Sequence, residues 1–314
     1  MKLLATIFLT IFTAANSSAF GGAPFEALNM AARPGGYQAA RLAVPVPARA
    51  YAAPVRKERD NMINLLGASE RFMGVPYVLG PMGEGPDGEF DRGPLVSYTA
   101  LDCTTFVEET MAFALGGEAG ALDILRRIRY QNGVISYQTR NHFTELDWLP
   151  NNIVAGFLRD ITAEVAGPSA KTVSKLISKR AWYAAKTEAD LHGFGWEAPA
   201  ARAQRLARLQ ALGEFMPDQT ATISYVPLED LPRVLAAIPS GTVVNVVRED
   251  RADKPTLVTH QFFIFDGPKG KIIRHAALNK QVMDVDAAQY IAGLANAQWR
   301  ILGFSLAAVV NPGP

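Results

Sequence analysis

The amino-acid sequence predicts an α+β fold in which a group of helices precedes an antiparallel sheet. Apolar residues recur mainly at helical spacing from about residue 57 to 213. From about residue 221 onward, alternating or β-branched runs bounded by turn residues replace this pattern. Most of the turns between these runs are too short for crossover helices, so the strands should pair antiparallel. Helices followed by consecutive strands are typical of the α+β class.

The N-terminal residues 1–19 have the three parts of a secretory signal peptide. Lys2 supplies a short positive region, and residues 3–15 form an apolar run that is too short to cross a membrane. The small residues Ser-Ser-Ala at 17–19 precede the expected cleavage after Ala19. A buried N-terminal helix is the alternative. We therefore expect an exported protein, periplasmic or secreted, without stable membrane insertion.

The rest of the chain divides into a leader and one folded domain. Residues 20–55 are rich in alanine, proline and glycine, which predicts a loosely packed leader. The domain is expected over residues 56–314, beginning with a helical stripe at 57–72. The charge is nearly balanced, with 31 basic against 30 acidic residues, so nothing indicates a nucleic-acid partner. The oligomeric state stays open.

The single cysteine follows a long loop and opens a helix. Residues 74–94 are rich in glycine and proline, and loops of this length are often functional, although a surface insertion fits equally well. Asp102 is a good helix cap, and apolar residues recur at helical spacing from Phe106 onward, which puts Cys103 in the first turn. A helix N-terminus stabilises a thiolate, so we expect a lowered pKa for Cys103. A buried structural cysteine is the alternative.

Residues 122–212 contain few candidates for catalytic or ligand-binding side chains. Residues 122–130 predict a basic amphipathic helix with a solvated face, and residues 134–140 predict a strand or an extended loop. His142 lies in a polar and aromatic cluster, where a hydrogen-bonded structural role is favoured over ligand binding. His192 is expected in a loop, and the sequence names no partner for it. Three further helices are predicted at 154–165, 170–187 and 200–212.

Two histidines lie on neighbouring predicted strands. The expected strands are 221–226, 242–247, 258–265, 271–276 and 301–310, with a short helix at 228–238. His260 and His275 belong to two strands joined by a short turn, so their side chains should be close enough for contact. Together with Cys103 they form a possible nucleophile, base and orienting group. A metal site is a weaker rival, because no carboxylate pattern or cysteine pair accompanies them. We therefore expect no metal and no cofactor.

At these residues the sequence resembles a known group of enzymes, the NlpC/P60 cysteine peptidase superfamily. The resemblance is carried by Asp102-Cys103 at a helix start, by His260 and His275 on their strands, and by the lead-in Gly74-Val-Pro-Tyr77 with Gly80. More narrowly, the chain resembles the DUF1460 family, described as N-acetylmuramoyl-L-alanine amidase-like. The segments that carry this closer resemblance are Asp102–Glu108, Thr139–Phe143, Asp147-Trp148 and the helical insertion before the sheet.

The resemblance implies a papain-like core, in which a catalytic helix packs on an antiparallel sheet, with a helical insertion. It implies that Cys103 attacks an amide carbonyl, that His260 acts as base and then as acid, and that His275 orients His260. The backbone N–H of Cys103 would hold the oxyanion, with Tyr77 as a second donor.

The resemblance leaves the roles of three further residues open. Asp102 would either cap the helix or contact substrate. Arg140 would pair with a substrate carboxylate or form a structural ion pair. His142 would belong to the substrate-binding group.

The implied function is that of an exported cysteine amidase acting on peptidoglycan fragments or muropeptides. The expected bond joins N-acetylmuramic acid to L-alanine. A stem-peptide DL-endopeptidase is the alternative within the superfamily, and a non-catalytic muropeptide-binding protein is the alternative of another class. The absence of a recognisable wall-anchoring repeat favours soluble muropeptides over the intact sacculus as substrate.

Overall fold

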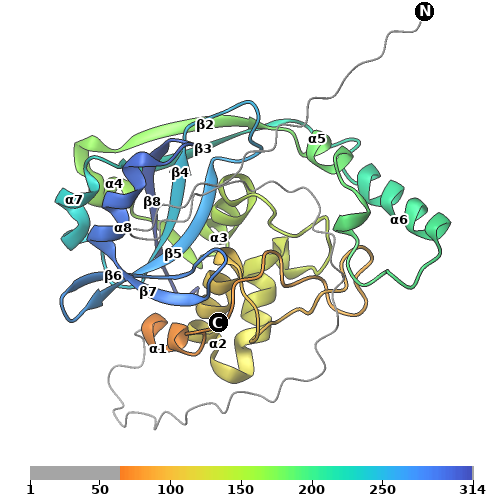
Figure 1. Ribbon diagram of the computed structural model, residues 1–314, viewed down its shortest axis with the longest axis horizontal. Coiled ribbons are helices and arrows are strands. Elements are labelled where there is room, and N and C mark those ends of the chain that lie inside the picture. Colours follow the sequence, from red (N-terminus) through yellow and green to blue (C-terminus); the bar gives the residue numbers. More distant parts are fainter. Residues whose placement is uncertain (1–63, 313–314) are drawn as a thin grey trace, which may run out of the picture.

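The computed structural model describes residues 64–312, which form one antiparallel sheet with helices on both faces (Figure 1). The strands are β1 Leu158–Asp160, β2 Lys171–Ile177, β3 Gln219–Pro227, β4 Thr242–Arg248, β5 Val258–Gly267, β6 Gly270–Ala276, β7 Val282–Asp286 and β8 Ile301–Val309. The α-helices are α1 Leu65–Glu70, α2 Cys103–Arg129, α3 Leu149–Val154, α4 Thr162–Ala166, α5 Lys179–Ala184, α6 Pro199–Ala211, α7 Leu231–Val234 and α8 Ala287–Gly293. The predicted signal peptide and leader lie outside the described residues.

The sheet order is β2-β3-β8-β4-β5-β6-β7, and β1 pairs with β8 off this path. All strand pairs are antiparallel, which confirms the α+β class. The predicted meander is confirmed for β4 to β6 but is wrong for the last strand, because β8 returns between β3 and β4. A Cβ atom on Gly303 of β8 would lie 1.8 Å from the carbonyl oxygen of Val226, so only glycine permits this approach of β3.

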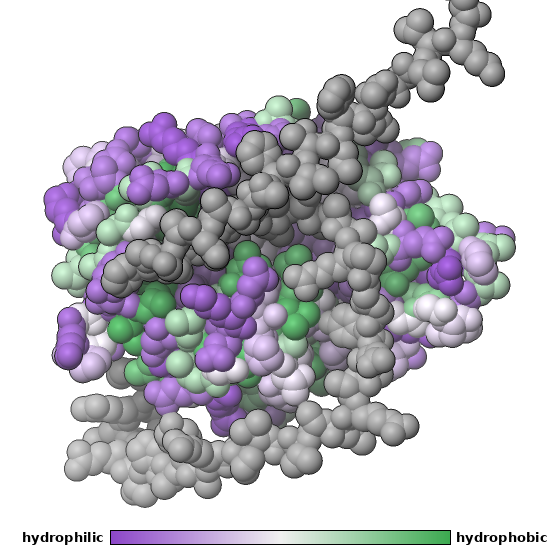
Figure 2. Space-filling view, in the orientation of Figure 1, coloured by the Kyte–Doolittle hydropathy of each residue, from purple (hydrophilic) through white to green (hydrophobic). Residues whose placement is uncertain are grey.

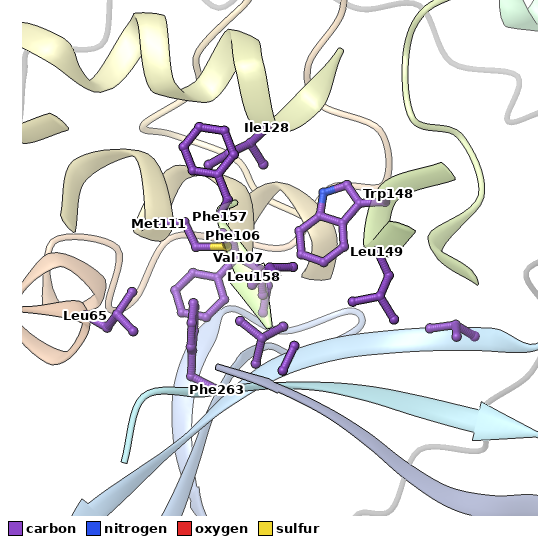
Figure 3. Packing of buried hydrophobic residues seen from close by; sticks show 14 of the residues in the cluster. Leu65, Phe106, Val107, Met111, Ile128, Trp148, Leu149, Phe157, Leu158 and Phe263 are labelled. Carbon is purple, nitrogen blue, oxygen red and sulfur yellow. The ribbon is translucent and has the colours of Figure 1, made fainter. Parts of the chain in front are cut away.

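Helix α2 covers one face of the sheet. Its residues Phe106, Val107 and Met111 belong to a buried cluster with Phe263 and Phe265 of β5, as the close view in Figure 3 shows for the first four. The rings of Phe106 and Phe263 meet edge to face, with centroids 5.9 Å apart. This packing fixes the position of the α2 N-terminus over the start of β5.

Residues of the opposite parity on β5 face the other side of the sheet. There Phe262 and Ile264 pack with apolar residues of α7 and α8. Since both faces of the central strands are covered, β4 is buried along its whole length. The edge strand β2 exposes polar side chains, among them Lys171, Thr172 and Ser174, and Figure 2 shows hydrophilic surface along this edge of the molecule.

The helical prediction for residues 170–187 is wrong in its first half, where β2 pairs with β3 over seven residues. In β2 the buried residues Lys175 and Ile177 alternate with exposed ones, a two-residue period that a helical interpretation conceals. The short strand β1 also lies inside a predicted helix, and β7 and α8 were not predicted. Helix α6 confirms the prediction at 200–212, and with α5 it projects away from the sheet in Figure 1.

The helix predicted at 122–130 is the second half of α2, after a break in helical geometry at Gly117. Residues 134–140 contain no strand beyond one isolated bridge between Tyr130 and Arg140. Six shorter 3-10 or π turns complete the fold: Gln131–Gly133, Thr144–Trp148, Gly167–Ser169, Glu188–Asp190, Leu235–Ala237 and Leu294–Asn296. Between residues 64 and 312, no helix has the length and apolar character that crossing a bilayer requires.

Candidate active site

A cleft of about 390 Å³ lies where the first turn of α2 meets the start of β5. Cys103, His260 and His275 all line it, so the structure brings together the three residues that the sequence singled out. Tyr77, Asp102, Arg140 and His142 line the same cleft. Every side chain proposed from the sequence therefore borders one space.

Asp102 caps α2, as predicted. Its Oδ1 accepts hydrogen bonds from the backbone N–H and the hydroxyl of Thr105, both at 2.8 Å, while Thr105 Oγ1 accepts from the Asp102 N–H at 2.9 Å. This reciprocal capping box satisfies donors at the helix start. The second carboxylate oxygen of Asp102 accepts the Gly80 N–H at 2.9 Å, which attaches the preceding loop to the helix. Cys103 consequently sits at a fixed first turn.

His260 and His275 form a hydrogen-bonded pair across β5 and β6. Nε2 of His260 lies 2.9 Å from Nδ1 of His275, and both rings are buried. Burial, with His275 and Arg248 nearby, holds the pKa of His260 well below its usual value. Burial likewise lowers the pKa of His275 to about 4. Both imidazoles are therefore neutral at pH 7, and one ring donates the shared proton to the other.

The predicted low pKa of Cys103 is wrong for this arrangement. Burial, together with the neighbouring Asp102 carboxylate, raises the pKa of the thiol to about 12. The backbone N–H of Gln261 and the hydroxyl of Thr104 act in the opposite direction. Desolvation disfavours the thiolate more than these donors and the helix terminus stabilise it. The site thus holds a neutral thiol beside neutral imidazoles.

A chain of hydrogen-bonded polar side chains joins the nucleophile segment to the histidine strand. The Thr104 hydroxyl donates to Gln261 Oε1 at 2.7 Å, and Gln261 Nε2 donates to Asn245 Oδ1 at 2.8 Å. Thr104 follows Cys103 in the chain, and Gln261 follows His260. Sequence reasoning missed this link, although a glutamine inside an apolar strand was the available signal.

Arg140 forms a structural ion pair, which was one of the two predicted alternatives. Its Nη2 contacts Glu84 and lies 2.9 Å from Asp91 Oδ2. His192, for which the sequence names no partner, lies 3.2 Å from Asp91 Oδ1 through Nδ1, and this contact raises the pKa of His192. Glu84 and Asp91 come from the long loop before α2. The loop is therefore held by buried charges, in contrast to a surface insertion.

His142 is a hydrogen-bonded histidine within an aromatic group. Its Nε2 lies 2.7 Å from the Tyr137 carbonyl oxygen, and its ring centroid lies 4.6 Å from that of Trp182. Burial lowers the pKa of His142 well below its usual value. Tyr77 is half-buried in the wall of the cleft, and its backbone N–H donates to the backbone carbonyl oxygen of Lys280. The structure places both residues beside the reacting groups without assigning them a contact to substrate.

A second buried network lies on α2, one turn beyond Cys103. Arg129 Nη1 lies 2.9 Å from Glu108 Oε2, and Trp148 Nε1 donates to Glu108 Oε1 at 3.0 Å. Arg129 also donates to the Met82 carbonyl. The prediction of a solvated face for residues 122–130 is therefore wrong at Arg129. Its guanidinium contacts Met82 of the loop and Glu108 in the first half of α2, and Glu108 in turn accepts the Trp148 N–H.

Residues 64–312 contain no group of three or more His, Cys, Asp or Glu side chains arranged to hold a metal ion.

Comparison with known proteins connects this site to a family. A family model described as AmiA-like, N-acetylmuramoyl-L-alanine amidase-like, matches residues 67–297. A solved structure from Legionella pneumophila, described as DUF1460, has 28% identity and a TM-score of 0.74, covering 78% of this chain and 88% of its own. A structure named as an N-acetylmuramoyl-L-alanine amidase from Bacteroides uniformis has 22% identity and a TM-score of 0.58, covering 79% and 100%. At that identity the second likeness shows the fold alone. No curated protein matches the chain. Because the family model spans most of the folded region, including Cys103, His260 and His275, the chain belongs to the AmiA-like family of N-acetylmuramoyl-L-alanine amidase-like proteins.

Proposed function

We propose that this protein is a cysteine amidase that hydrolyses the bond between N-acetylmuramic acid and L-alanine in peptidoglycan fragments. The observation that carries the proposal is the shared cleft, which holds Cys103 at a capped helix start beside the His260–His275 pair. Membership of an amidase-like family supports the peptidoglycan-type substrate. Nucleophile, base and orienting group on separate rigid elements are what acyl transfer requires.

The neutral pair suggests how the thiol is activated. With His275 Nδ1 accepting the proton on Nε2 of His260, Nδ1 of His260 carries the lone pair. This nitrogen takes the Cys103 proton as sulfur attacks the amide carbonyl. The resulting imidazolium is stabilised by its hydrogen bond to His275. General-base transfer during attack replaces a thiolate formed in advance.

The remaining steps follow from the same groups. The carbonyl oxygen becomes an oxyanion near the start of α2, where the Cys103 N–H and the helix dipole stabilise negative charge, with the Tyr77 hydroxyl as a second donor. The imidazolium then protonates the nitrogen of L-alanine as the C–N bond breaks, leaving a thioester on Cys103. Water, deprotonated by His260, attacks the thioester and releases the muramoyl carboxylate and the free thiol.

The same proposal places the catalytic domain among papain-like NlpC/P60 enzymes. The capped cysteine helix packed on an antiparallel sheet and the histidine pair on adjacent strands support this placement. We also propose export, on the basis of the N-terminal residues 1–19. N-terminal sequencing of protein recovered from a periplasmic fraction would give Phe20 if Ala19 ends the signal, and Met1 would contradict export by cleavage.

The decisive experiment is mass spectrometry of defined muropeptides incubated with the protein and with Cys103→Ala. Release of a free peptide that begins with L-alanine, lost in the variant, is the expected result. Cleavage within the stem by the wild type alone would identify an endopeptidase. Muropeptide binding without any cleavage would identify a binding protein. His260→Gln, which keeps a side chain of similar size, should abolish turnover while the protein stays folded.

A further inference from the structure

Tyr290 of α8 packs against the orienting member of the histidine pair. Its ring meets the His275 ring edge to face, with centroids 5.5 Å apart and an interplanar angle of 84°. It meets the ring of Phe262 in the same way, with centroids 5.6 Å apart. Helix α8 covers the face of the sheet opposite α2, so this contact supports the histidine pair from behind the sheet. Sequence analysis did not predict α8 and assigned Tyr290 no role.

The orientation of His275 depends on few contacts. Between residues 64 and 312, the His275 ring hydrogen-bonds to His260 alone, at 2.9 Å. The aromatic rings that pack on His275 in this part of the chain are those of His260 and Tyr290. The His260 ring is the one that His275 has to orient, so it cannot also be the fixed reference. Tyr290 is therefore the aromatic contact that holds His275 in place.

The hydroxyl of Tyr290 does not explain why a tyrosine occupies this position. Its oxygen is buried and has no hydrogen-bond partner within residues 64–312. Burial raises the pKa of Tyr290, and the nearby Cys103 acts in the same direction, so the hydroxyl stays protonated at neutral pH. A buried hydroxyl without a partner lowers folding stability. The contribution of this side chain is therefore that of its ring.

The ring acts on the reaction only through the histidine pair, because Tyr290 is not among the residues that line the cleft. In the proposed mechanism, Nδ1 of His260 takes the Cys103 proton, and Nε2 of the same ring is bonded to His275. A turn of the His275 ring would move this hydrogen bond and redirect Nδ1 of His260 away from the sulfur.

We infer that Tyr290 is a positioning residue, which sets the direction of the base His260 by holding the ring of His275 edge to face. The inference rests on the proposed function, since it concerns how the same groups are aligned for proton transfer. A displacement of about 1 Å between reacting groups can lower a rate about one hundred-fold. Loss of the ring should therefore lower kcat, while KM changes little because substrate does not contact Tyr290.

Steady-state kinetics on a defined muropeptide compare variants that keep or remove the ring. Tyr290→Leu removes the ring and should lower kcat at least about tenfold. Tyr290→Met is a second variant without a ring, with a side chain that adapts more easily to the space, and should show the same loss. Tyr290→Phe keeps the ring and should retain the kcat of the wild type.

A matched control removes apolar volume from the same helix. Ile291 follows Tyr290, is buried, and belongs to the apolar cluster on this face of the sheet. Ile291→Ala should lower the urea concentration at the midpoint of unfolding and leave kcat unchanged. A loss of kcat in Ile291→Ala as large as in Tyr290→Leu would assign the effect to the packing of α8 and would overturn the inference.

Nuclear magnetic resonance of the imidazole groups tests the orientation without turnover. The chain has four histidines, so their ring signals can be assigned in nitrogen-15-labelled protein. The proton shared by His260 and His275 should give an imidazole N–H signal that is kept in Tyr290→Phe and shifted or lost in Tyr290→Leu.

The outcomes separate the inference from the proposed function. An equal loss of kcat in Tyr290→Phe and Tyr290→Leu would assign the effect to the hydroxyl and overturn the inference. An unchanged kcat or an unchanged imidazole signal in Tyr290→Leu would overturn it as well. Failure of the proposed function shows separately, as absence of cleavage by the wild type while the imidazole signal still responds to loss of the ring.

Discussion

Replacing Gln261 with leucine removes the centre of the polar chain that joins Thr104 to Asn245. Gln261 is fully buried, and both of its hydrogen bonds, at 2.7 and 2.8 Å, are to side chains. The variant leaves Asn245 Oδ1 without its donor inside the sheet, where Asn245 Nδ2 already has no partner among the described residues. The half-exposed Thr104 hydroxyl can turn to water. One buried unsatisfied group costs about 1–3 kcal/mol of folding free energy, so we expect a loss of this size.

The larger effect should be on turnover. The hydrogen bond between Thr104 and Gln261 fixes the residue after Cys103 against the residue after His260. A displacement of about 1 Å between reacting groups can lower a rate about one hundred-fold. We therefore expect kcat to fall at least about tenfold, while KM changes little because the Gln261 side chain is fully buried and its hydrogen bonds go to Thr104 and Asn245. Urea unfolding and steady-state kinetics measure the two effects on the same protein.

A double-variant cycle provides the control. Thr104→Val keeps the shape of the side chain and removes the donor, and the Thr104–Gln261 pair should show a coupling energy of about 1 kcal/mol in the stability measurements. If the effects of the two variants on stability are additive, the Thr104–Gln261 hydrogen bond does not contribute to folding stability. An unchanged kcat in both single variants would refute the positioning argument, even if the protein were destabilised.

Three further predictions concern titration. Iodoacetamide should modify Cys103 at a rate that rises about tenfold per pH unit from pH 7 to 9, because its pKa is raised to about 12; a plateau near pH 6 would indicate a preformed thiolate. Lowering the pH from 6.5 to 4 should reduce the free energy of unfolding by about 3 kcal/mol through His275 alone, because its pKa of about 4 in the folded protein lies below the unfolded value and the unfolded chain binds more protons in this range. In urea unfolding, His275→Gln should flatten the dependence of stability on pH over this range. An unchanged slope in the variant would contradict the prediction. Burial raises the pKa of Glu109 to about 8, so the contribution of its protonated form to folding stability is lost as the pH rises from about 4.5 through 8. Glu109→Gln should therefore stabilise the protein by about 2–4 kcal/mol at pH 8 and have little effect at pH 4. A variant that is destabilised at pH 8 would show that the carboxylate is needed.

The features that the sequence predicted correctly depend on short-range patterns. The cap at Asp102 and the helix beginning at Cys103 follow from adjacent residues, and the pairing of β5 with β6 follows from one tight turn. His260 and His275 are fifteen positions apart, so the register of a hairpin is sufficient to predict their contact.

The features that sequence reasoning missed depend on long-range packing. Thr104 and Gln261 are 157 positions apart, and no local pattern links them. The insertion of β8 between β3 and β4, and the pairing of β2 with β3, are chosen by sheet packing that overrides local propensity. The pKa of Cys103 was predicted in the wrong direction because a helix terminus is visible in sequence, whereas the depth of burial is not.

Burial keeps the reactive groups of the cleft neutral. It disfavours an imidazolium on His260, with smaller contributions from His275 and Arg248, and it disfavours a thiolate on Cys103. Neither group gains from carrying charge before the reaction begins. The proton should therefore move from Cys103 to His260 only as sulfur attacks the amide carbonyl, which is the general-base transfer proposed for this site.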